Sequence, residues 1–475
     1  MTAEPGLLGA LAEIVGARHV LTHPDDLAAC RADGRGAEGG LPMAALRPAS
    51  AQQVCAIMRL AMARALRVVV QGARTGLVGG GLPTDTEADL VVSLDRLSRH
   101  IEIDPANRTA TVDAGVRLSA LNAVAAEYGL FLPIDLGADP MIGGMIATNT
   151  GGSRLLRYCD MRANLLALDM VRASEDGELL TLGAPLRKNN TGIDLKHLLV
   201  GSGGSMGIVM RATVSLQPLP ATRLSALIAL READAALPLL QACEAAFGSA
   251  LSAFEGMSAA ALAAAFAHVP SLRRPFETLP CYALLIELSG GSAFTEAMLE
   301  EGLAAVLAPF MEGENAVVAD AAIDRRDDLW AIRHALPEGL RASGAVVACD
   351  IALKRGDLMR FRSMARAALA REAPGFVPHD FGHIGDGGLH YNLVWPKRDG
   401  PVDPERADRA RALIFDMVVR DFGGSFSAEH GIGPRNMSFY ARFVPEPLRR
   451  LAGAVQHVVA PRRMGRVDFG MTGNG

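Results

Sequence analysis

The stretch of sequence that most constrains the fold covers residues 133–152 and reads PIDLGADPMIGGMIATNTGG. Glycines recur in it among aspartate, threonine and asparagine. Glycine adopts backbone angles that other residues avoid and lets the main chain approach a bulky neighbour closely. A loop that ends in a buried turn is the alternative interpretation. The repeated glycines favour a backbone pressed against a large ligand.

Two further glycine-rich blocks lie at residues 71–83 (QGARTGLVGGGLP) and 201–208 (GSGGSMGI). The first follows an apolar strand pattern at residues 67–70, and backbone amides free of side-chain bulk can wrap an anionic group. It is therefore a candidate phosphate cradle, with an ordinary glycine-rich turn as the alternative. It matches neither the Walker pattern nor a G-x-G-x-x-G leading into a helix, which disfavours an ATPase or a nicotinamide-binding fold.

Helical and strand patterns alternate around these blocks. Residues 54–61 have helical spacing, and prolines at 218 and 220 interrupt any continuous helix or strand. Beyond them the composition turns alanine-rich, with a strand predicted at 282–288. A chain of 475 residues is too long for one ordinary core, so we expect at least two domains. Between the helical pattern at 54–61 and the prolines, the sequence predicts strands at 90–94, 101–103 and 109–112 and a helix at 118–128.

A second cluster of chemically active residues reads HIGDGGLHYN at residues 383–392 and SAEHG at 427–431. Two histidines seven residues apart do not share a helix face, but a glycine turn leading into a strand can bring them together. Imidazole suits Zn, Fe and Ni, and a carboxylate such as Glu429 completes a three-ligand set with an open position. The adjacent His430 supplies a base. Two histidines with ordinary polar roles in a turn are the alternative.

Composition excludes several classes of function. The net charge of −5 and a pI near 6.1 give no electrostatic footprint for nucleic acid. The six cysteines form neither a C-x-x-C pair nor an iron–sulfur array, which fits a reducing compartment. The sequence shows no apolar run of membrane-spanning length and no signal-peptide pattern. We expect a cytoplasmic location, with peripheral attachment to the inner membrane as the alternative.

The glycine blocks, HIGDGGLHYN and SFSAEHGIG closely resemble the FAD-linked 2-hydroxy-acid dehydrogenases. That family includes D-lactate and D-2-hydroxyglutarate dehydrogenases and the flavin subunit of glycolate oxidase, within the vanillyl-alcohol-oxidase type of flavoprotein. The resemblance implies an α+β fold. It assigns a two-subdomain FAD-binding domain to residues 1–219 and an antiparallel-sheet-and-helix substrate (cap) domain carrying the metal site to residues 220–425. Residues 426–475 would return to the flavin domain.

The resemblance also implies that the three glycine blocks hold non-covalent FAD. Arg74 stands where the family has glycine, and it either adds a charge to the pyrophosphate or crowds the loop. Gly203 replaces a glutamate and removes a hydrogen-bond acceptor, whereas Ser205 replaces a threonine and keeps a hydroxyl. The implied flavin-binding residues are Gln71, Gly72, Ala73, Arg74, Thr75, Gly76, Leu77, Asp135, Gly137, Ile142, Gly143, Gly144, Thr148, Gly151, Gly152, Ser205, Gly207 and Ile208.

The reaction implied by the family is oxidation of a D-2-hydroxy acid to the 2-keto acid with hydride transfer to flavin N5. A divalent metal, with Zn2+ as the first choice, would be held by His383, His390 and Glu429. His430 would accept the hydroxyl proton. Arg333, in the segment DLWAIRH, would grip the substrate carboxylate, with a plain surface charge as the alternative, and Asn392 would orient the substrate.

Two departures from the family concern the substrate. Ala348 stands where 2-hydroxyglutarate dehydrogenases have a lysine before the next strand, and Pro337 stands where a hydroxyl residue is common. The sequence therefore favours D-lactate or a longer monocarboxylate over 2-hydroxyglutarate. A quinone, a cytochrome or an electron-transfer flavoprotein is expected as electron acceptor, and a homodimer stays open. The alternatives are the flavin subunit of a glycolate-oxidase-type complex and a flavin-binding paralogue with a decayed substrate site.

Overall fold

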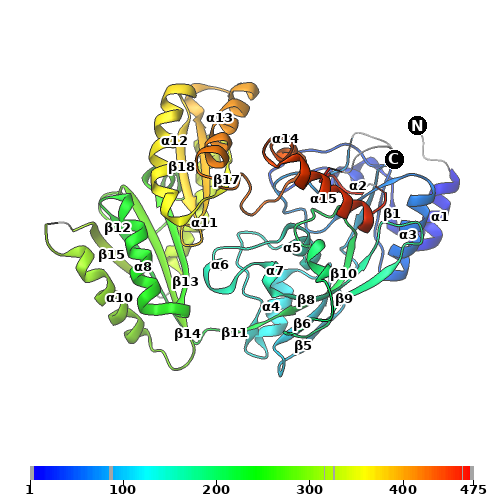
Figure 1. Cartoon of the computed structure of the whole chain (residues 1–475), viewed down its shortest axis with the longest axis horizontal. Coiled ribbons are helices and arrows are strands. Elements are labelled where there is room, and N and C mark those ends of the chain that lie inside the picture. The colour runs from blue at the N-terminus through cyan, green and yellow to red at the C-terminus, as the bar shows by residue number, and fades with distance from the viewer. Residues whose placement is uncertain (1–4, 85–88, 315, 325–326, 463, 471–475) are drawn as a thin grey trace. The chain divides into compact units, whose positions relative to one another are not determined.

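The computed structural model describes residues 5–84, 89–314, 316–324, 327–462 and 464–470. Contacts between residues divide the chain into two compact units (Figure 1). Unit 1 comprises Met1–Gly151, Asp160–Leu219 and Glu429–Gly475, and unit 2 comprises Gly152–Cys159 and Pro220–Ala428. The short segment 152–159, which the sequence analysis placed in the first domain, groups with unit 2.

Unit 1 begins with a small four-stranded sheet, in the order β1-β2-β4-β3, whose strand β4 runs parallel to β2 and β3. Helix α3 is capped by Ser50, whose hydroxyl accepts a hydrogen bond from the N–H of Gln53. Such a cap satisfies one of the donors that the first turn of a helix leaves unpaired. The elements are α1 (Pro5–Val15), β1 (Val20–Leu21), α2 (Pro24–Ala28), β2 (Ala44–Leu46), α3 (Ala51–Ala63), β3 (Arg67–Gln71) and β4 (Asp89–Ser93).

A five-stranded antiparallel sheet, in the order β5-β6-β10-β8-β9, forms the rest of the unit 1 framework. Helix α5, formed by part of the glycine block at residues 133–152, which is the second of the three along the chain, contacts β6 and β10 of this sheet. The elements are β5 (Ile101–Asp104), β6 (Thr109–Asp113), α4 (Leu118–Ala126), β7 (Leu130–Phe131), α5 (Ile142–Thr148), α7 (Met161–Asn164), β8 (Leu165–Val171), β9 (Leu179–Gly183), β10 (Ile208–Ser215) and β11 (Gln217–Pro218), followed near the C-terminus by α14 (Gly433–Phe443) and α15 (Glu446–Val459).

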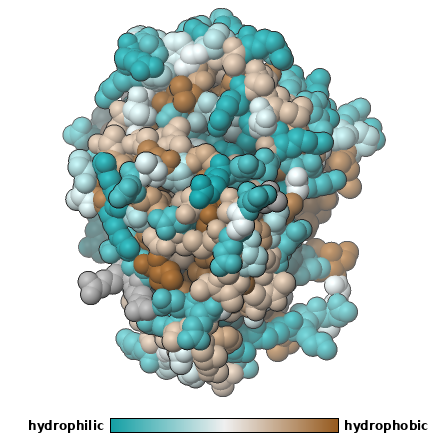
Figure 2. Space-filling model, turned by 90° about the vertical axis from the view of Figure 1, so that its left-hand side faces the viewer, coloured by the Kyte–Doolittle hydropathy of each residue, from teal (hydrophilic) through white to brown (hydrophobic). Residues whose placement is uncertain are grey.

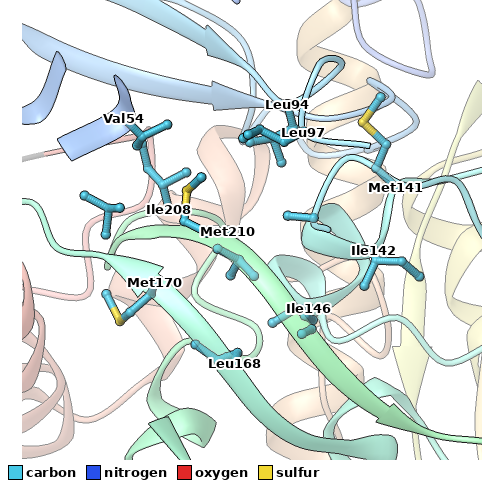
Figure 3. Close-up of a cluster of buried hydrophobic side chains, with 14 of the residues drawn as sticks. Val54, Leu94, Leu97, Met141, Ile142, Ile146, Leu168, Met170, Ile208 and Met210 are labelled. Atoms are coloured by element: carbon cyan, nitrogen blue, oxygen red, sulfur yellow. The ribbon is translucent and has the colours of Figure 1, made fainter. Parts of the chain in front are cut away.

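One hydrophobic core joins the four-stranded and the five-stranded sheet of unit 1. Val54 from α3, Leu94 after β4, Ile142 from α5 and Ile208 from β10 belong to the same buried cluster (Figure 3). Each such side chain contributes about 1.5–3 kcal/mol when fully buried. This shared core fixes helix α5, and with it the second glycine block, against both sheets.

Unit 2 contains one large antiparallel sheet, in the order β15-β12-β14-β13-β18-β19-β16, with β17 paired to β19. Helices α9 and α11 pack together on one face through a core that includes Met257, Leu285 and Leu336. The strands are β12 (Thr222–Leu230), β13 (Leu251–Ser258), β14 (Tyr282–Gly290), β15 (Val318–Asp324), β16 (Gly344–Val347), β17 (Asp350–Ala352), β18 (Val377–Gly382) and β19 (Gly388–Pro396).

Every residue of the central strands β13 and β14 is buried, whereas β15 at the edge of the sheet has exposed residues. The helices are α6 (Leu155–Tyr158), α8 (Ala236–Phe247), α9 (Ala259–His268), α10 (Glu296–Met311), α11 (Asp328–Ser343), α12 (Leu358–Glu372) and α13 (Pro404–Asp416). The predicted α+β class, with a second domain of helices on an antiparallel sheet, is therefore confirmed.

The outer surface of unit 2 near α10 is mixed in character. Figure 2, which views the left-hand side of Figure 1, shows hydrophobic residues in small groups among hydrophilic ones. Within the described ranges, no helix combines the length and the apolar character needed to span a bilayer.

Candidate active site and flavin loops

The two predicted metal-binding histidines converge in unit 2. His383 follows strand β18, and the N–H groups of Asp386 and Gly388 both donate to its carbonyl, which closes a tight turn into β19. His390 lies in β19, and the two imidazole centroids are 5.1 Å apart. Gly387 has a φ of +97°, and a Cβ there would lie 2.3 Å from the carbonyl oxygen of Leu353. Glycine is therefore required for the turn that brings the histidines together.

Glu429 supplies the third predicted ligand. It follows Ala428, whose N–H donates to the Asp350 carbonyl at 3.2 Å, so the path of the chain places it beside β17. Potential ligand atoms of His383, His390 and Glu429 all lie within 4.8 Å of one another. Asp350, Glu429 and His430 form a second grouping of the same kind. Two imidazoles and one carboxylate match the ligand set of catalytic zinc sites.

Each histidine also has a carboxylate partner that the sequence analysis missed. His383 Nδ1 lies 2.6 Å from Glu255 Oε1, and His390 Nδ1 lies 3.4 Å from Asp350 Oδ1. The hydrogen bond at Nδ1 of His383 leaves Nε2 as the nitrogen of that ring that can ligate a metal. Histidines that bind metals almost always donate their other N–H group to a carboxylate, carbonyl or water. The residues present therefore fit a divalent metal.

Glu255 lies in strand β13 with 1% of its surface exposed. Burial opposes its charged form, but His383 and Arg333 outweigh burial and lower the pKa of Glu255 to about 2. The only sequence signal for this residue is a charged side chain inside the otherwise uncharged run LSAFEGMS. Such a residue is expected to be paired.

Arg333 is on helix α11 and is 8% exposed, which excludes the alternative that it is a surface charge. Its Nε donates to Glu255 Oε2 at 2.6 Å, and its guanidinium lies 4.7 Å from the centroid of the Phe381 ring. The hydrogen bond to Glu255 uses Nε, so the two terminal amino groups have the fork geometry that suits a planar carboxylate.

Asn392 is in β19, two residues after His390, so both side chains project from the same face of the strand. It is buried, and its Nδ2 lies 3.4 Å from the His390 carbonyl oxygen. His430 belongs to the grouping with Asp350 and Glu429. The structure thus gathers the predicted metal ligands and base around β17 and β19.

The three glycine blocks assemble in unit 1. The N–H groups of Gly201 and Gly203 donate to the carbonyls of Ile146 and Ala147 at the end of α5, at 3.1 and 2.8 Å. A Cβ on Gly80 would lie 3.9 Å from the Gly203 carbonyl oxygen. The first block therefore lies against the third, and the third lies against the second. Parts of the chain separated by more than a hundred residues form one set of loops.

Main-chain atoms are accessible at several glycines of these loops, as binding of the predicted FAD requires. A Cβ added to Gly76, Gly137 or Gly144 would meet no atom of the described chain within 4 Å, apart from the adjoining residues and the backbone of helix α5. Such positions let a ligand approach the main chain directly. Gly72 differs, because its Cβ would contact Met141 at 3.5 Å.

Other predicted flavin residues have packing roles in addition. Ile142 and Ile208 direct their side chains into the hydrophobic core, as Figure 3 shows. A Cβ on Gly143 would lie 2.9 Å from that of Ala114, and one on Gly207 would lie 2.2 Å from Met170 Cε. These four residues can present only their backbone to a ligand.

Several polar members of the predicted set hold the loops themselves. The Gln71 amide donates to the carbonyls of Cys30 and Gly81, both at 2.7 Å. The buried Ser205 hydroxyl donates to the Ser202 carbonyl, and the Thr148 hydroxyl donates to the Gly144 carbonyl. The Gly76 carbonyl accepts a hydrogen bond from the N–H of Gly34. A Cβ on Gly34 would lie 2.8 Å from the Thr75 carbonyl oxygen. Among the remaining members, Ala73, Leu77 and Asp135 are half-buried, and Gly151 and Gly152 are buried.

Backbone conformation bears on two departures from the family pattern in the flavin loops, Arg74 and Gly203. Arg74 has a φ of +57°, in the left-handed region that glycine occupies most easily. Gly203 has a φ of +63°, and a Cβ there would lie 2.6 Å from Val467 Cγ2. A glutamate side chain at position 203 is therefore incompatible with the packing of the C-terminal segment in this chain.

The segment after the second glycine block is anchored in unit 2. Arg154 makes two hydrogen bonds of 2.7 Å to the Glu287 carboxylate, and Arg157 donates to the Ser289 hydroxyl at 2.7 Å. Trp330 Nε1 also donates to Glu287, at 3.0 Å. These contacts are the physical reason that residues 152–159 group with unit 2.

Comparison with known proteins identifies the class. Models of the FAD binding domain and of the C-terminal domain of FAD linked oxidases match residues 42–183 and 219–463. D-2-hydroxyglutarate dehydrogenase of Xanthomonas citri pv. viticola is 34% identical over 466 residues, which cover 96% of this chain and 95% of that protein. The mitochondrial D-2-hydroxyglutarate dehydrogenase of Arabidopsis thaliana is 31% identical, over 95% of this chain and 78% of that protein.

The fold has relatives beyond this sequence similarity. A structure of p-cresol methylhydroxylase with substrate bound aligns with a TM-score of 0.73 at 15% identity, over 96% of this chain and 94% of that one. The fold is that of the vanillyl-alcohol-oxidase type, and the chain is an FAD-dependent oxidoreductase. It belongs to the family of FAD-linked 2-hydroxy-acid dehydrogenases that its motifs resemble.

Proposed function

We propose that this enzyme oxidises a D-2-hydroxy monocarboxylate, D-lactate or a longer homologue, to the corresponding 2-keto acid. The observation that carries the proposal is the pair of carboxylate-backed histidines, His383 and His390, together with the buried Arg333, in a chain of this family. When bound, FAD supplies the hydride acceptor and a divalent metal supplies positive charge that favours ionisation of a hydroxyl group.

The chain's own residues have distinct roles in this proposal. His383, His390 and Glu429 would hold the metal, with Zn2+ as the first choice. Arg333 binds the substrate carboxylate through its terminal amino groups. His430 accepts the proton of the C2 hydroxyl, and Asn392 orients the substrate. Proton transfer of this kind typically contributes a factor of about 10² to 10⁴ in rate.

The preference for a monocarboxylate rests on two positions. Ala348 ends in a methyl group, and Pro337 lies within helix α11 and offers no side-chain donor. Neither side chain offers a charge or a hydrogen-bond donor to a second carboxylate. D-2-hydroxyglutarate is the second candidate substrate, because relatives at 31–34% identity carry that activity in their names. The reduced flavin then passes its electrons to a quinone, a cytochrome or an electron-transfer flavoprotein, in the cytoplasm or at the inner membrane surface.

An anaerobic titration of the purified yellow protein tests the proposal. D-lactate, a longer D-2-hydroxy acid, D-2-hydroxyglutarate and glycolate are added in turn, and the visible flavin band is recorded. Bleaching by the monocarboxylates at lower concentration than by D-2-hydroxyglutarate is the expected result. Preferential bleaching by D-2-hydroxyglutarate or glycolate would contradict the substrate assignment. A flavin band that none of these acids bleaches would contradict the reaction itself.

A further inference from the structure

The side chain of Glu255 occupies a position that is unfavourable for a charge. Strand β13 is buried along its whole length between β14 and β18, and Glu255 is 1% exposed. A carboxylate removed from water is destabilising unless charged or polar partners compensate for the lost hydration. The compensation here comes from two donors on two different elements, and both donors are residues of the candidate active site.

Each oxygen of Glu255 has one of these donors. Oε1 lies 2.6 Å from His383 Nδ1, in the turn between β18 and β19. Oε2 accepts a hydrogen bond of 2.6 Å from Arg333 Nε, on helix α11. The donors are 128 and 78 residues away along the chain. One carboxylate therefore connects a predicted metal ligand to the predicted substrate-binding arginine.

We propose that Glu255 is a positioning residue that fixes both the ligating nitrogen of His383 and the plane of the Arg333 guanidinium. The inference rests on the proposed function and adds a residue to it. Glu255 does not touch the substrate or the metal in this proposal. It acts through the two residues that it holds.

The effect on His383 concerns the ring tautomer. A carboxylate at Nδ1 requires a hydrogen on that nitrogen, so Nε2 carries the lone pair that a metal needs. The same contact holds the orientation of the ring. Loss of such a partner typically lowers metal affinity about 10- to 100-fold.

The effect on Arg333 concerns geometry. The guanidinium is rigid and planar, so a hydrogen bond at Nε together with the Phe381 ring 4.7 Å below fixes where the terminal amino groups point. Arginine without such support would have to lose side-chain freedom when a carboxylate binds. A pre-positioned arginine binds the carboxylate at a smaller entropic cost.

Glu287 provides an internal comparison. It is equally buried, at 1% exposure, on the neighbouring strand β14, and it also pairs with an arginine. Its partners are Arg154, Trp330, Ser252 and, at 3.9 Å, Arg223, and the proposed reaction uses none of them. Glu287→Gln is therefore a matched control for the loss of a buried ion pair in the same sheet.

Zinc titration by calorimetry tests the proposal, with FAD-loaded full-length protein from which divalent metals have been removed by a chelator. In Glu255→Gln the amide has one acceptor for two donors, so it cannot satisfy both His383 and Arg333. The dissociation constant for zinc is expected to rise about 10- to 100-fold in Glu255→Gln, whereas Glu287→Gln stays within about 3-fold of the unaltered protein. Thermal unfolding of both variants shows whether their folds are equally affected.

Each outcome decides a different point. Equal zinc affinity in Glu255→Gln and the unaltered protein would overturn the positioning role while leaving the metal site in place. An equal loss in Glu287→Gln would show that any buried ion pair in this sheet has the same effect, which also overturns it. Absence of zinc binding by the unaltered protein would overturn the metal site and this inference together. If Glu255→Gln does not fold, Glu255→Asp keeps the charge with a shorter reach, and the same loss of affinity is expected.

Discussion

In unit 1 the predicted flavin loops present their backbone, whereas in unit 2 the side chains of His383 and Arg333 are both held by the buried carboxylate of Glu255. Ile142 and Ile208 turn into the core, and Gly76 and Gly144 leave the main chain accessible. Arg333, by contrast, is fixed by a carboxylate. Substitutions in the flavin loops of unit 1 should therefore act by filling the space next to the main chain or by straining the backbone φ angle. Substitutions in unit 2 should act through loss of a specific chemical group.

The largest effect is expected for the base. His430→Asn removes the proposed proton acceptor and should slow flavin reduction by substrate about 10²- to 10⁴-fold, with little change in flavin binding. Stopped-flow absorbance under anaerobic conditions measures this rate. His457→Asn, at an exposed position on α15, is the control and should keep the full rate. Flavin reduction at the full rate in His430→Asn would contradict the assignment of His430 as the base.

Arg333→Lys tests whether substrate binding depends on the guanidinium group and not only on its charge. Lysine keeps the charge but loses the planar fork and the hydrogen bond from Nε, so Glu255 loses a partner. Hydrogen bonds to charged groups contribute about 1.5–3 kcal/mol, and substrate binding should weaken by about that amount. The substrate concentration that half-reduces the flavin at equilibrium is the measurement. An unchanged value would show that Arg333 has only a structural role.

Alanine substitutions at two glycines of unit 1 distinguish a packing role from contact with the ligand. Gly207→Ala should lower the free energy of unfolding by about 1–3 kcal/mol, because its Cβ would lie 2.2 Å from Met170 Cε and 3.0 Å from the Val171 carbonyl oxygen. Gly144→Ala, inside α5 with no described atom within 4 Å, should gain up to about 1 kcal/mol and yet weaken FAD binding. Denaturant unfolding of the FAD-free protein and fluorescence titration with FAD measure the two quantities. Unaltered FAD affinity in Gly144→Ala would place the cofactor elsewhere.

The smallest effect concerns Arg74. Its left-handed φ of +57° costs a non-glycine residue about 1–2 kcal/mol, so Arg74→Gly should stabilise the protein by up to about 1 kcal/mol after the greater chain entropy of glycine is counted. FAD affinity in the same variant decides between the two interpretations of this arginine. Weaker binding would mean that its charge contributes to holding the pyrophosphate, and tighter binding would mean that the side chain crowds the loop.

Local patterns were sufficient for much of the site. The spacing of His383 and His390 around a glycine turn predicted their convergence, and the structure brings their rings to 5.1 Å. Glycine spacing likewise predicted loops with accessible backbone, as at Gly76 and Gly137. These features depend on residues a few positions apart, whose relative placement is set by turn and strand geometry.

Other features escaped prediction because their partners are far apart in the sequence. Glu255 was overlooked, since nothing near it in the chain indicates that His383 would be its partner. The attachment of residues 152–159 to unit 2 depends on Arg154 and Glu287, which are 133 residues apart. The space next to Gly203 is limited by Val467, which lies near the C-terminus of the chain.

The sequence by itself determined the family, the FAD cofactor and the α+β class, because these depend on glycine positions and on motifs of about ten residues. Tertiary structure alone decided which carboxylates support the histidines and which predicted flavin residues turn into the core. The physical reason is that sheet pairing sets these contacts. The pairing of β13 with β18 places Gly256 opposite Gly382, and thereby Glu255 within reach of His383.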